Sequence, residues 1–172
     1  MIIDPGNSDV TSLTDYISAE ALESEFIILT HRHFDHCAGL NELRAMYPNA
    51  KFVCSKECNI AIQNSRLNCS GLSNMVPSFT IDSADIIYDG IGLLPWNGHY
   101  VECVPTPGHT IDSISIIIRN NVFTGDSLLK HTPVITKLPS GNKEQQKKTD
   151  EYLRSLHGMN IYPGHGENFI ID

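Results

Sequence analysis

A run of metal-ligand side chains at positions 31–36 constrains this chain more than any other feature. The run reads His-Arg-His-Phe-Asp-His and follows directly on a short apolar stretch. In an extended backbone, residues two apart point the same way, so His31 and His33 can approach one metal ion. Asp35 and His36 come where the chain turns toward the next helix, and they can reach a second point. The run therefore predicts ligands for two adjacent metal ions.

Three further segments share the design of an apolar strand followed by a turn and a His or Asp. In each of them a glycine stands immediately before the polar residue, which permits a sharp turn. The polar residues are His109, Asp126 and His165. Because ligand sites of α/β sheets collect at the carboxyl ends of strands, the four segments form one site if their strands lie side by side.

Hydrophobic periodicity predicts the secondary structure. We expect strands at 2–3, 26–30, 51–54, 86–94, 100–105, 113–118, 122–124 and 159–162. We expect helices at about 10–17, 38–47, 56–63 and 143–156. The stretch 64–79 is rich in Ser, Asn, Gly and Pro, which predicts a long irregular loop. Strands and helices alternate without a repeat or linker, so we expect a single α/β layered domain over residues 1–172.

The composition excludes several classes of function. The chain has 12 Lys and Arg against 20 Asp and Glu, and its net charge is −8. Because nucleic-acid binding relies on basic side chains, we expect no nucleic-acid partner. No apolar stretch is long enough to span a membrane. Residues 1–6 have no basic start and no apolar signal core, so we do not expect secretion. The five cysteines are irregularly spaced, so we expect a cytoplasmic protein with reduced thiols and no membrane partner.

These motifs resemble the metallo-β-lactamase superfamily. The resemblance is carried, in the family's order, by the run 31–36, Thr-Pro-Gly-His-Thr at 106–110, Gly-Asp at 125–126 and Pro-Gly-His-Gly at 163–166. Ile-Asp-Pro-Gly at 3–6 fits the same pattern. The nearest branch is glyoxalase II-like, whose pattern also has the Thr-Pro-Gly-His-Thr sequence. The resemblance implies an αββα sandwich with a site at one edge.

The resemblance also implies a role for each ligand. The first metal ion would be bound by three histidines: His31, His33 and His109. The second ion would be bound by Asp35, His36 and His165. Asp126 would bridge the ions, and Asp4 matches a position where a carboxylate orients a metal-bound histidine. All seven ligand positions are filled, which implies two divalent ions, zinc in first place and iron or manganese as alternatives.

The charges of this ligand set imply a hydrolytic mechanism. Two divalent ions, the carboxylates of Asp35 and Asp126 and a bridging hydroxide leave the centre with about one positive charge. Metal binding lowers the pKa of water to about 7, so the hydroxide would exist at neutral pH and attack a polarised carbonyl. Asp35 and Asp126 are the predicted catalytic residues, with Asp35 as the proton shuttle. The positive centre favours a small, anionic substrate.

The leading hypothesis is hydrolysis of a small thioester, ester or lactone by glyoxalase II-like chemistry. We expect the C-terminal domain with which glyoxalase II holds glutathione to be missing, and glutathione thioesters to be poor substrates. The segment 127–142 matches no known pocket, although Lys130 and Lys137 are candidate contacts for a substrate carboxylate. The alternatives are an iron-dependent persulfide dioxygenase-like oxidoreductase, a phosphodiesterase or nuclease, and metal storage or sensing.

One departure from the family concerns the start of the chain. The family usually has a strand pair ahead of the Ile-Asp-Pro-Gly segment, which here begins at residue 3. Either the sandwich is trimmed at its N-terminus, or the gene start is placed late, or another chain covers the edge; of these we expect the trimmed sandwich. Because a bare sheet edge invites pairing with another strand, we also expect a homodimer.

Overall fold

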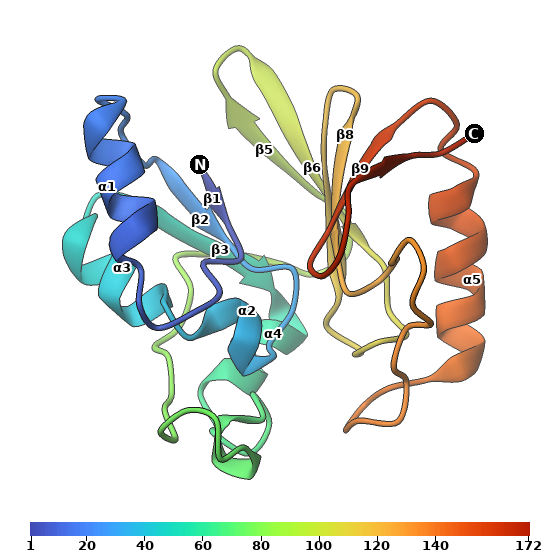
Figure 1. Cartoon of the computed structure of the whole chain (residues 1–172), viewed down its shortest axis with the longest axis horizontal. Helices are drawn as coiled ribbons and strands as arrows, with labels where there is room; N and C mark the ends of the chain where they lie inside the picture. Colours follow the sequence, from blue (N-terminus) through green and yellow to red (C-terminus); the bar gives the residue numbers. More distant parts are fainter. The chain divides into compact units, whose positions relative to one another are not determined.

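The computed structural model describes all residues from 1 to 172, which form two compact units, Met1–Ile87 and Tyr88–Asp172. Each unit contains a β-sheet and at least one α-helix; the first is drawn in blue to green and the second in yellow to red (Figure 1). The α/β class predicted from the sequence is confirmed. The expectation of a single domain stays a prediction.

The first unit is built on a four-stranded sheet with the strand order β1-β2-β3-β4. Its strands are β1 (Ile2–Ile3), β2 (Phe26–Ile28), β3 (Lys51–Ser55) and β4 (Ile86–Tyr88). β1, β2 and β3 run parallel, and Ile27 of β2 lies beside Ile2 on one side and Phe52 on the other. Parallel strands end at the same edge of a sheet, so the residues that follow β1 and β2 come close together.

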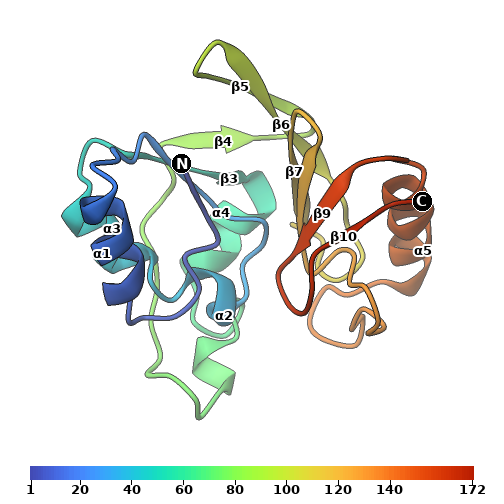
Figure 2. The same cartoon turned by 45° about the horizontal axis from the view of Figure 1, so that its top comes forward.

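The helices of this unit are α1 (Thr11–Ala19), α2 (Phe34–Cys37), α3 (Leu40–Met46) and α4 (Lys56–Ile62). α1 and α3 lie side by side (Figures 1 and 2) and contribute Ile17, Leu40 and Leu43 to the core. Ile27 and Phe52 of the sheet belong to the same core. The expected helix at 38–47 is shorter, and α2 precedes it, because the turn into the helix begins already at Phe34.

The loop expected at 64–79 is irregular apart from one 3-10 turn, Ser70–Leu72. Asn68 is buried at its base, and its side-chain amide donates to the carbonyl oxygens of Ile62 at 3.4 Å and Phe79 at 3.0 Å. The two ends of the loop are therefore tied together by one side chain.

The second unit is built on a six-stranded sheet with the order β10-β9-β8-β7-β6-β5. Its strands are β5 (Gly92–Trp96), β6 (His99–Pro105), β7 (Ile114–Ile118), β8 (Asn121–Gly125), β9 (Asn160–Pro163) and β10 (Phe169–Ile170). Neighbouring strands are antiparallel except β8 and β9, which run parallel. The parallel pair brings the ends of β8 and β9 to the same edge.

Turn residues explain where the predicted strands differ from the observed ones. The expected strand 86–94 is wrong as one element: it is divided between β4 and β5, and Gly90 between them has φ +98°, which interrupts an extended chain. The turn at Asn97 and Gly98 joins β5 to β6, with φ +48° and +72° as a type I′ hairpin requires. The strands expected at 113–118 and 122–124 correspond to β7 and β8, which pair as an antiparallel hairpin.

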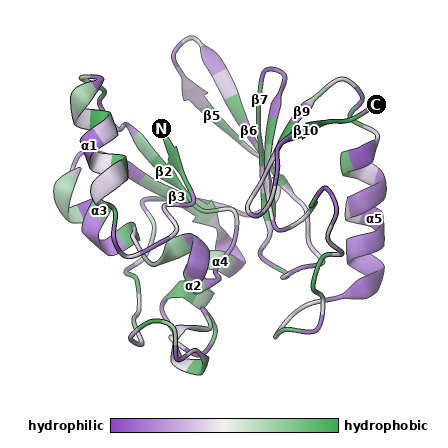
Figure 3. Ribbon diagram, viewed as in Figure 1, coloured by the Kyte–Doolittle hydropathy of each residue, from purple (hydrophilic) through white to green (hydrophobic).

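Helix α5 (Lys143–Arg154) covers part of the second sheet. The Asn142 side chain caps it by accepting from the amides of Glu144 and Gln145. α5 is mainly hydrophilic (Figure 3) and buries only Thr149 and Leu153. Leu153 packs in a core whose other members are Val122, Leu128, Ile161 and Ile171. No helix in the chain combines the length and hydropathy that a membrane-spanning segment needs.

Candidate metal centre

In the first unit, Asp4 lies at the centre of a hydrogen-bonded cluster at the ends of β1 and β2. Its Oδ1 accepts from the Thr30 amide at 2.7 Å, and its Oδ2 accepts from the Thr30 hydroxyl at 2.6 Å. The same Oδ2 lies 2.8 Å from Nδ1 of His36. One ligand atom each from Asp4, His31 and His36 lies within 4.8 Å of the other two. The carboxylate expected to orient a histidine therefore contacts His36 directly.

These contacts determine which imidazole nitrogens carry a lone pair. His36 donates from Nδ1 to the Asp4 carboxylate, so its Nε2 is the nitrogen available to a metal ion. The Thr30 hydroxyl donates to Asp4 and accepts from Nδ1 of His31 at 3.1 Å. His31 therefore also keeps its lone pair on Nε2.

The neighbouring nitrogens of His31 and His33 fit a shared cation. Nε2 of His31 lies 3.2 Å from Nδ1 of His33, and both side chains are buried. Two nitrogens bound tetrahedrally to one zinc ion at their usual distance lie about 3.4 Å apart. Asp35, the fourth predicted ligand of this unit, lies exposed on α2.

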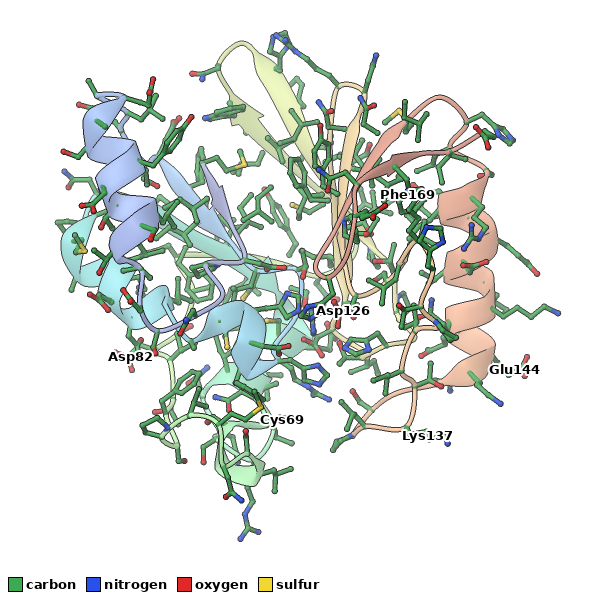
Figure 4. All side chains as sticks on the ribbon, in the orientation of Figure 1. Cys69, Asp82, Asp126, Lys137, Glu144 and Phe169 are labelled. Atoms are coloured by element: carbon green, nitrogen blue, oxygen red, sulfur yellow. The ribbon has the colours of Figure 1, made fainter.

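In the second unit, His109, Asp126 and His165 come together at the ends of three strands. Nε2 of His109 lies 3.5 Å from Oδ2 of Asp126, and Nε2 of His165 lies 3.6 Å from Oδ1. Asp126, which directly follows β8, is labelled in Figure 4. The amide of Gly164 donates to the carbonyl oxygen of Gly125 at 2.8 Å and joins the two loops. Each carboxylate oxygen of Asp126 thus faces a different histidine.

His109 has its second nitrogen oriented by the backbone. Its Nδ1 donates to the carbonyl oxygen of Ile135 at 2.7 Å, which leaves the lone pair on Nε2, the atom facing Asp126. His109 is buried, whereas the side chain of His165 is 53% exposed. The second unit therefore presents one fixed and one accessible histidine on the two sides of Asp126.

Lys130, a candidate contact for a substrate, lies in an ion pair. Its Nζ donates to Oε2 of Glu167 at 2.9 Å. This hydrogen bond and the charge of Lys130 lower the pKa of Glu167 below its ordinary value. The pair joins the segment after Asp126 to the segment after His165.

Two groups of the candidate centre were not expected from the sequence. Thr30 links Asp4 to His31. Threonine is common at strand ends, so its presence there does not predict a functional role. The carbonyl of Ile135 orients His109, and a backbone acceptor leaves no signal in the side-chain pattern. Of the seven predicted ligands, His31, His33, Asp35 and His36 belong to the first unit and His109, Asp126 and His165 to the second.

The sequence profile of the Metallo-beta-lactamase superfamily matches residues 1–165, and the chain belongs to this superfamily. It is 32% identical over 146 residues to "Probable metallo-hydrolase YqgX" of Bacillus subtilis, covering 84% of this chain and 68% of that protein. It is 31% identical over 179 residues to "Probable metallo-hydrolase MJ0888" of Methanocaldococcus jannaschii, covering 97% and 82%. Members of the superfamily are metal-dependent hydrolases, and the two side-chain clusters fit divalent metal ions.

A more distant similarity links the chain to hydroxyacylglutathione hydrolases. The hydroxyacylglutathione hydrolase of Francisella tularensis subsp. novicida is 28% identical over 168 residues, which are 96% of this chain. The match spans only 58% of that protein's length. This chain therefore corresponds to little more than half of that hydrolase.

Solved structures share the fold. The B3 metallo-beta-lactamase BLEG-1 has a TM-score of 0.91 at 24% identity, covering 98% of this chain and 82% of that one. TTHA1623 in a di-iron-bound form has a TM-score of 0.82 at 22% identity, covering 98% and 83%. ETHE1 from Myxococcus xanthus has a TM-score of 0.73 at 24% identity, covering 98% and 68%.

Proposed function

We propose that this protein is a binuclear metal-dependent hydrolase that cleaves a small thioester, ester or lactone. The observation that carries the proposal is the arrangement around Asp126, whose two oxygens face Nε2 of His109 and Nε2 of His165 at 3.5 and 3.6 Å. A carboxylate between two imidazole nitrogens suits two cations better than one. Both nitrogens are ring positions that commonly bind zinc.

In the proposed centre, the two ions share seven ligands. His31, His33 and His109 would hold one ion. Asp35, His36 and His165 would hold the other, and Asp126 would be shared by both. This assignment is supported by the order of the motifs in the superfamily and, within each unit, by the orientation of the histidine rings.

When bound, the ions would supply a water molecule of lowered pKa, about 7, and polarise the substrate carbonyl. The chain's own residues complete this chemistry. Asp4 keeps Nδ1 of His36 protonated, and through Thr30 it does the same for His31. Asp35 is exposed on α2, so its carboxylate can receive a proton and return it to the leaving group.

We propose zinc as the native metal because imidazole and carboxylate ligands without a thiolate form typical catalytic zinc sites. Iron is the alternative, since the same donors also bind iron and a structure of TTHA1623 is of a di-iron-bound form. The metal content of the purified protein separates the two.

We propose a thioester as the first substrate class to test, because hydroxyacylglutathione hydrolases are among the relatives. The positive charge of the centre favours an anionic substrate. The net charge of −8 opposes a nucleic-acid substrate. The cytoplasmic location and the homodimer stay predictions.

The proposal is tested by assaying the zinc-loaded protein on a panel of thioesters, esters, lactones and phosphodiesters. We expect turnover of at least one carbonyl substrate, loss of turnover after chelation, and no turnover by His33→Ala. Exclusive phosphodiester cleavage would assign the protein to the nuclease alternative. Oxygen uptake with one iron ion per chain would assign it to the persulfide dioxygenase-like alternative, and metal binding without any turnover would indicate storage or sensing.

A further inference from the structure

Helix α5 and the segment before it contact two of the three ligand-bearing loops of the second unit, those of His109 and Asp126. Four residues make these contacts, and we call them the brace: Ile135, Asn142, Gln146 and Thr149. Three of the four offer a donor to a backbone carbonyl beside a predicted ligand, and the fourth offers its own carbonyl to His109. The sequence alone suggests no functional role for any of these four residues.

The loop that carries His109 is held by the brace at two successive carbonyls. The Thr149 hydroxyl donates to the Pro107 carbonyl at 2.7 Å, and the backbone N–H of Asn142 donates to the Gly108 carbonyl at 2.8 Å. A Cβ atom on Gly108 would lie only 2.4 Å from Cα of Gln146. The backbone of α5 therefore lies directly against the residue that precedes His109.

The loop that carries Asp126 is held by the same helix. Nε2 of Gln146 donates to the carbonyl of Ser127 at 2.8 Å. The Ser127 hydroxyl in turn lies 3.0 Å from both the hydroxyl and the carbonyl oxygen of Thr106. Gln146 is thus the one side chain of α5 that lies against the His109 loop and also donates to the Asp126 loop.

The chemistry of Gln146 indicates more than packing. Its Oε1 is buried and makes no hydrogen bond, and burying an amide oxygen in this way costs stability. An apolar side chain of the same length would fill the space without that cost. The presence of an amide at this position is explained if the hydrogen bond from Nε2 to the Ser127 carbonyl is needed to hold Asp126 in place.

We propose that Gln146 is a positioning residue that sets the separation of His109 and Asp126 and thereby the affinity for metal. The proposal rests on the proposed function, because it requires these two residues to be ligands. The role of Gln146 has a reciprocal consequence. If an ordered α5 raises the affinity for metal by some factor, bound metal favours the ordered N-terminal part of α5 by the same factor.

The test is zinc affinity, measured by competition with a chelator on the purified full-length protein. Gln146→Met keeps the length of the side chain and removes the donor, and we expect it to bind zinc 10- to 100-fold more weakly. Gln145→Ala, one position earlier on the same helix, is the matched control and should bind zinc within about twofold of wild type. The metal-free forms of wild type and Gln146→Met should melt at similar temperatures, because a merely structural role would lower the melting temperature instead.

Hydrogen exchange provides the second measurement and needs no variant. In the wild-type protein, zinc should slow amide exchange in the first turns of α5; exchange there that is the same with and without zinc would overturn the proposal. Wild-type zinc affinity in Gln146→Met would overturn it as well. Asp126→Asn distinguishes failure of the proposed function from failure of the proposal about Gln146. If Asp126→Asn left zinc affinity unchanged, Asp126 would not be a ligand, and both the proposed function and the role of Gln146 would be wrong.

Discussion

The ligands of the first unit and those of the second are held in place by different means. In the first unit they come from one short run, and the single carboxylate of Asp4 orients His36 directly and His31 through Thr30. In the second unit they come from three separate loops, and backbone carbonyls accept most of the bonds that orient them. The histidines of the first unit are therefore oriented mainly by one charged group. The ligands of the second unit are oriented by several neutral hydrogen bonds.

This difference has a consequence for how each cluster responds to the substitution of one residue. Hydrogen bonds to charged groups contribute more than neutral ones, so loss of Asp4 removes several strong interactions at once. Loss of one neutral contact in the second unit leaves the others in place. Among the residues that orient ligands, we therefore expect loss of Asp4 to weaken metal binding at least as much as loss of any one neutral contact in the second unit.

The largest effect is expected at a ligand itself. Asp126→Ala should lower zinc affinity by more than roughly 100-fold, since removal of a residue that merely orients a ligand already costs 10- to 100-fold. Elemental analysis after dialysis measures the loss. Retention of all metal by Asp126→Ala would show that the carboxylate is not a ligand.

Asp4→Asn should have the next largest effect. The amide keeps the size of the side chain but loses the charge that holds the proton on Nδ1 of His36, so zinc affinity should fall about 10- to 100-fold. Asp9→Asn is the control, because Asp9 is exposed and its carboxylate accepts from the Thr11 amide at 3.1 Å rather than from a histidine. Equal zinc affinities of Asp4→Asn and Asp9→Asn would show that the charge of Asp4 does not orient the ligands of the first unit.

Gly108→Ala probes the contact between α5 and the His109 loop. Gly108 has φ +146°, and an added Cβ would meet the backbone of Gln146 at 2.4 Å, so we expect a loss of about 2–4 kcal/mol in the free energy of unfolding. Gly98→Ala has a positive φ but open space around it, and should cost only about 1–2 kcal/mol. Urea denaturation of both variants checks the difference, and similar losses would argue against a tight contact.

Thr30→Val should have a smaller effect, because it removes one hydroxyl and leaves Asp4 bonded to His36. We expect a loss of about 1–2 kcal/mol in unfolding free energy, and Thr30→Ser should recover most of it. Thermal melting of the metal-free protein is the measurement. A Val variant as stable as wild type would mean that the hydroxyl contributes nothing to the cluster.

The smallest effect is expected at the exposed pair of Lys130 and Glu167. Because the pKa of Glu167 is lowered in the folded state, the pair adds stability above the ordinary pKa of the group, and this stability is lost as pH falls through the lowered value. In Lys130→Met, a carboxylate titration followed by NMR should show the pKa of Glu167 rising toward its ordinary value. An unchanged pKa would show that the pair does not form in solution.

The same difference between the units explains what the sequence could and could not predict. His109, Asp126 and His165 are recognisable because each follows a glycine at the end of an apolar run, and the structure places them together. The carbonyl of Ile135 and the bond from Gln146 to Ser127 could not be predicted, because backbone acceptors are present at every residue. In the first unit, Asp4 is a charged side chain in a recognisable turn, so its role could be expected.

Some elements of the fold escaped prediction for local reasons. α2 begins at Phe34 without a capping side chain, so nothing in the run 31–36 marks a helix start. β10 has only two residues, too few for a periodic pattern. The stretch 86–94 is predicted as one strand because only a single residue in it, Gly90, marks the bend between β4 and β5.

The most direct test of the central claim is the number of metal ions per chain, measured by elemental analysis in wild type, His33→Ala and His165→Ala. The proposed centre predicts two zinc ions per chain in the wild-type protein and a reduced number in each variant. Two ions in wild type with no loss in either variant would contradict the assignment of ligands. A wild-type protein that binds at most one ion would contradict the binuclear centre itself.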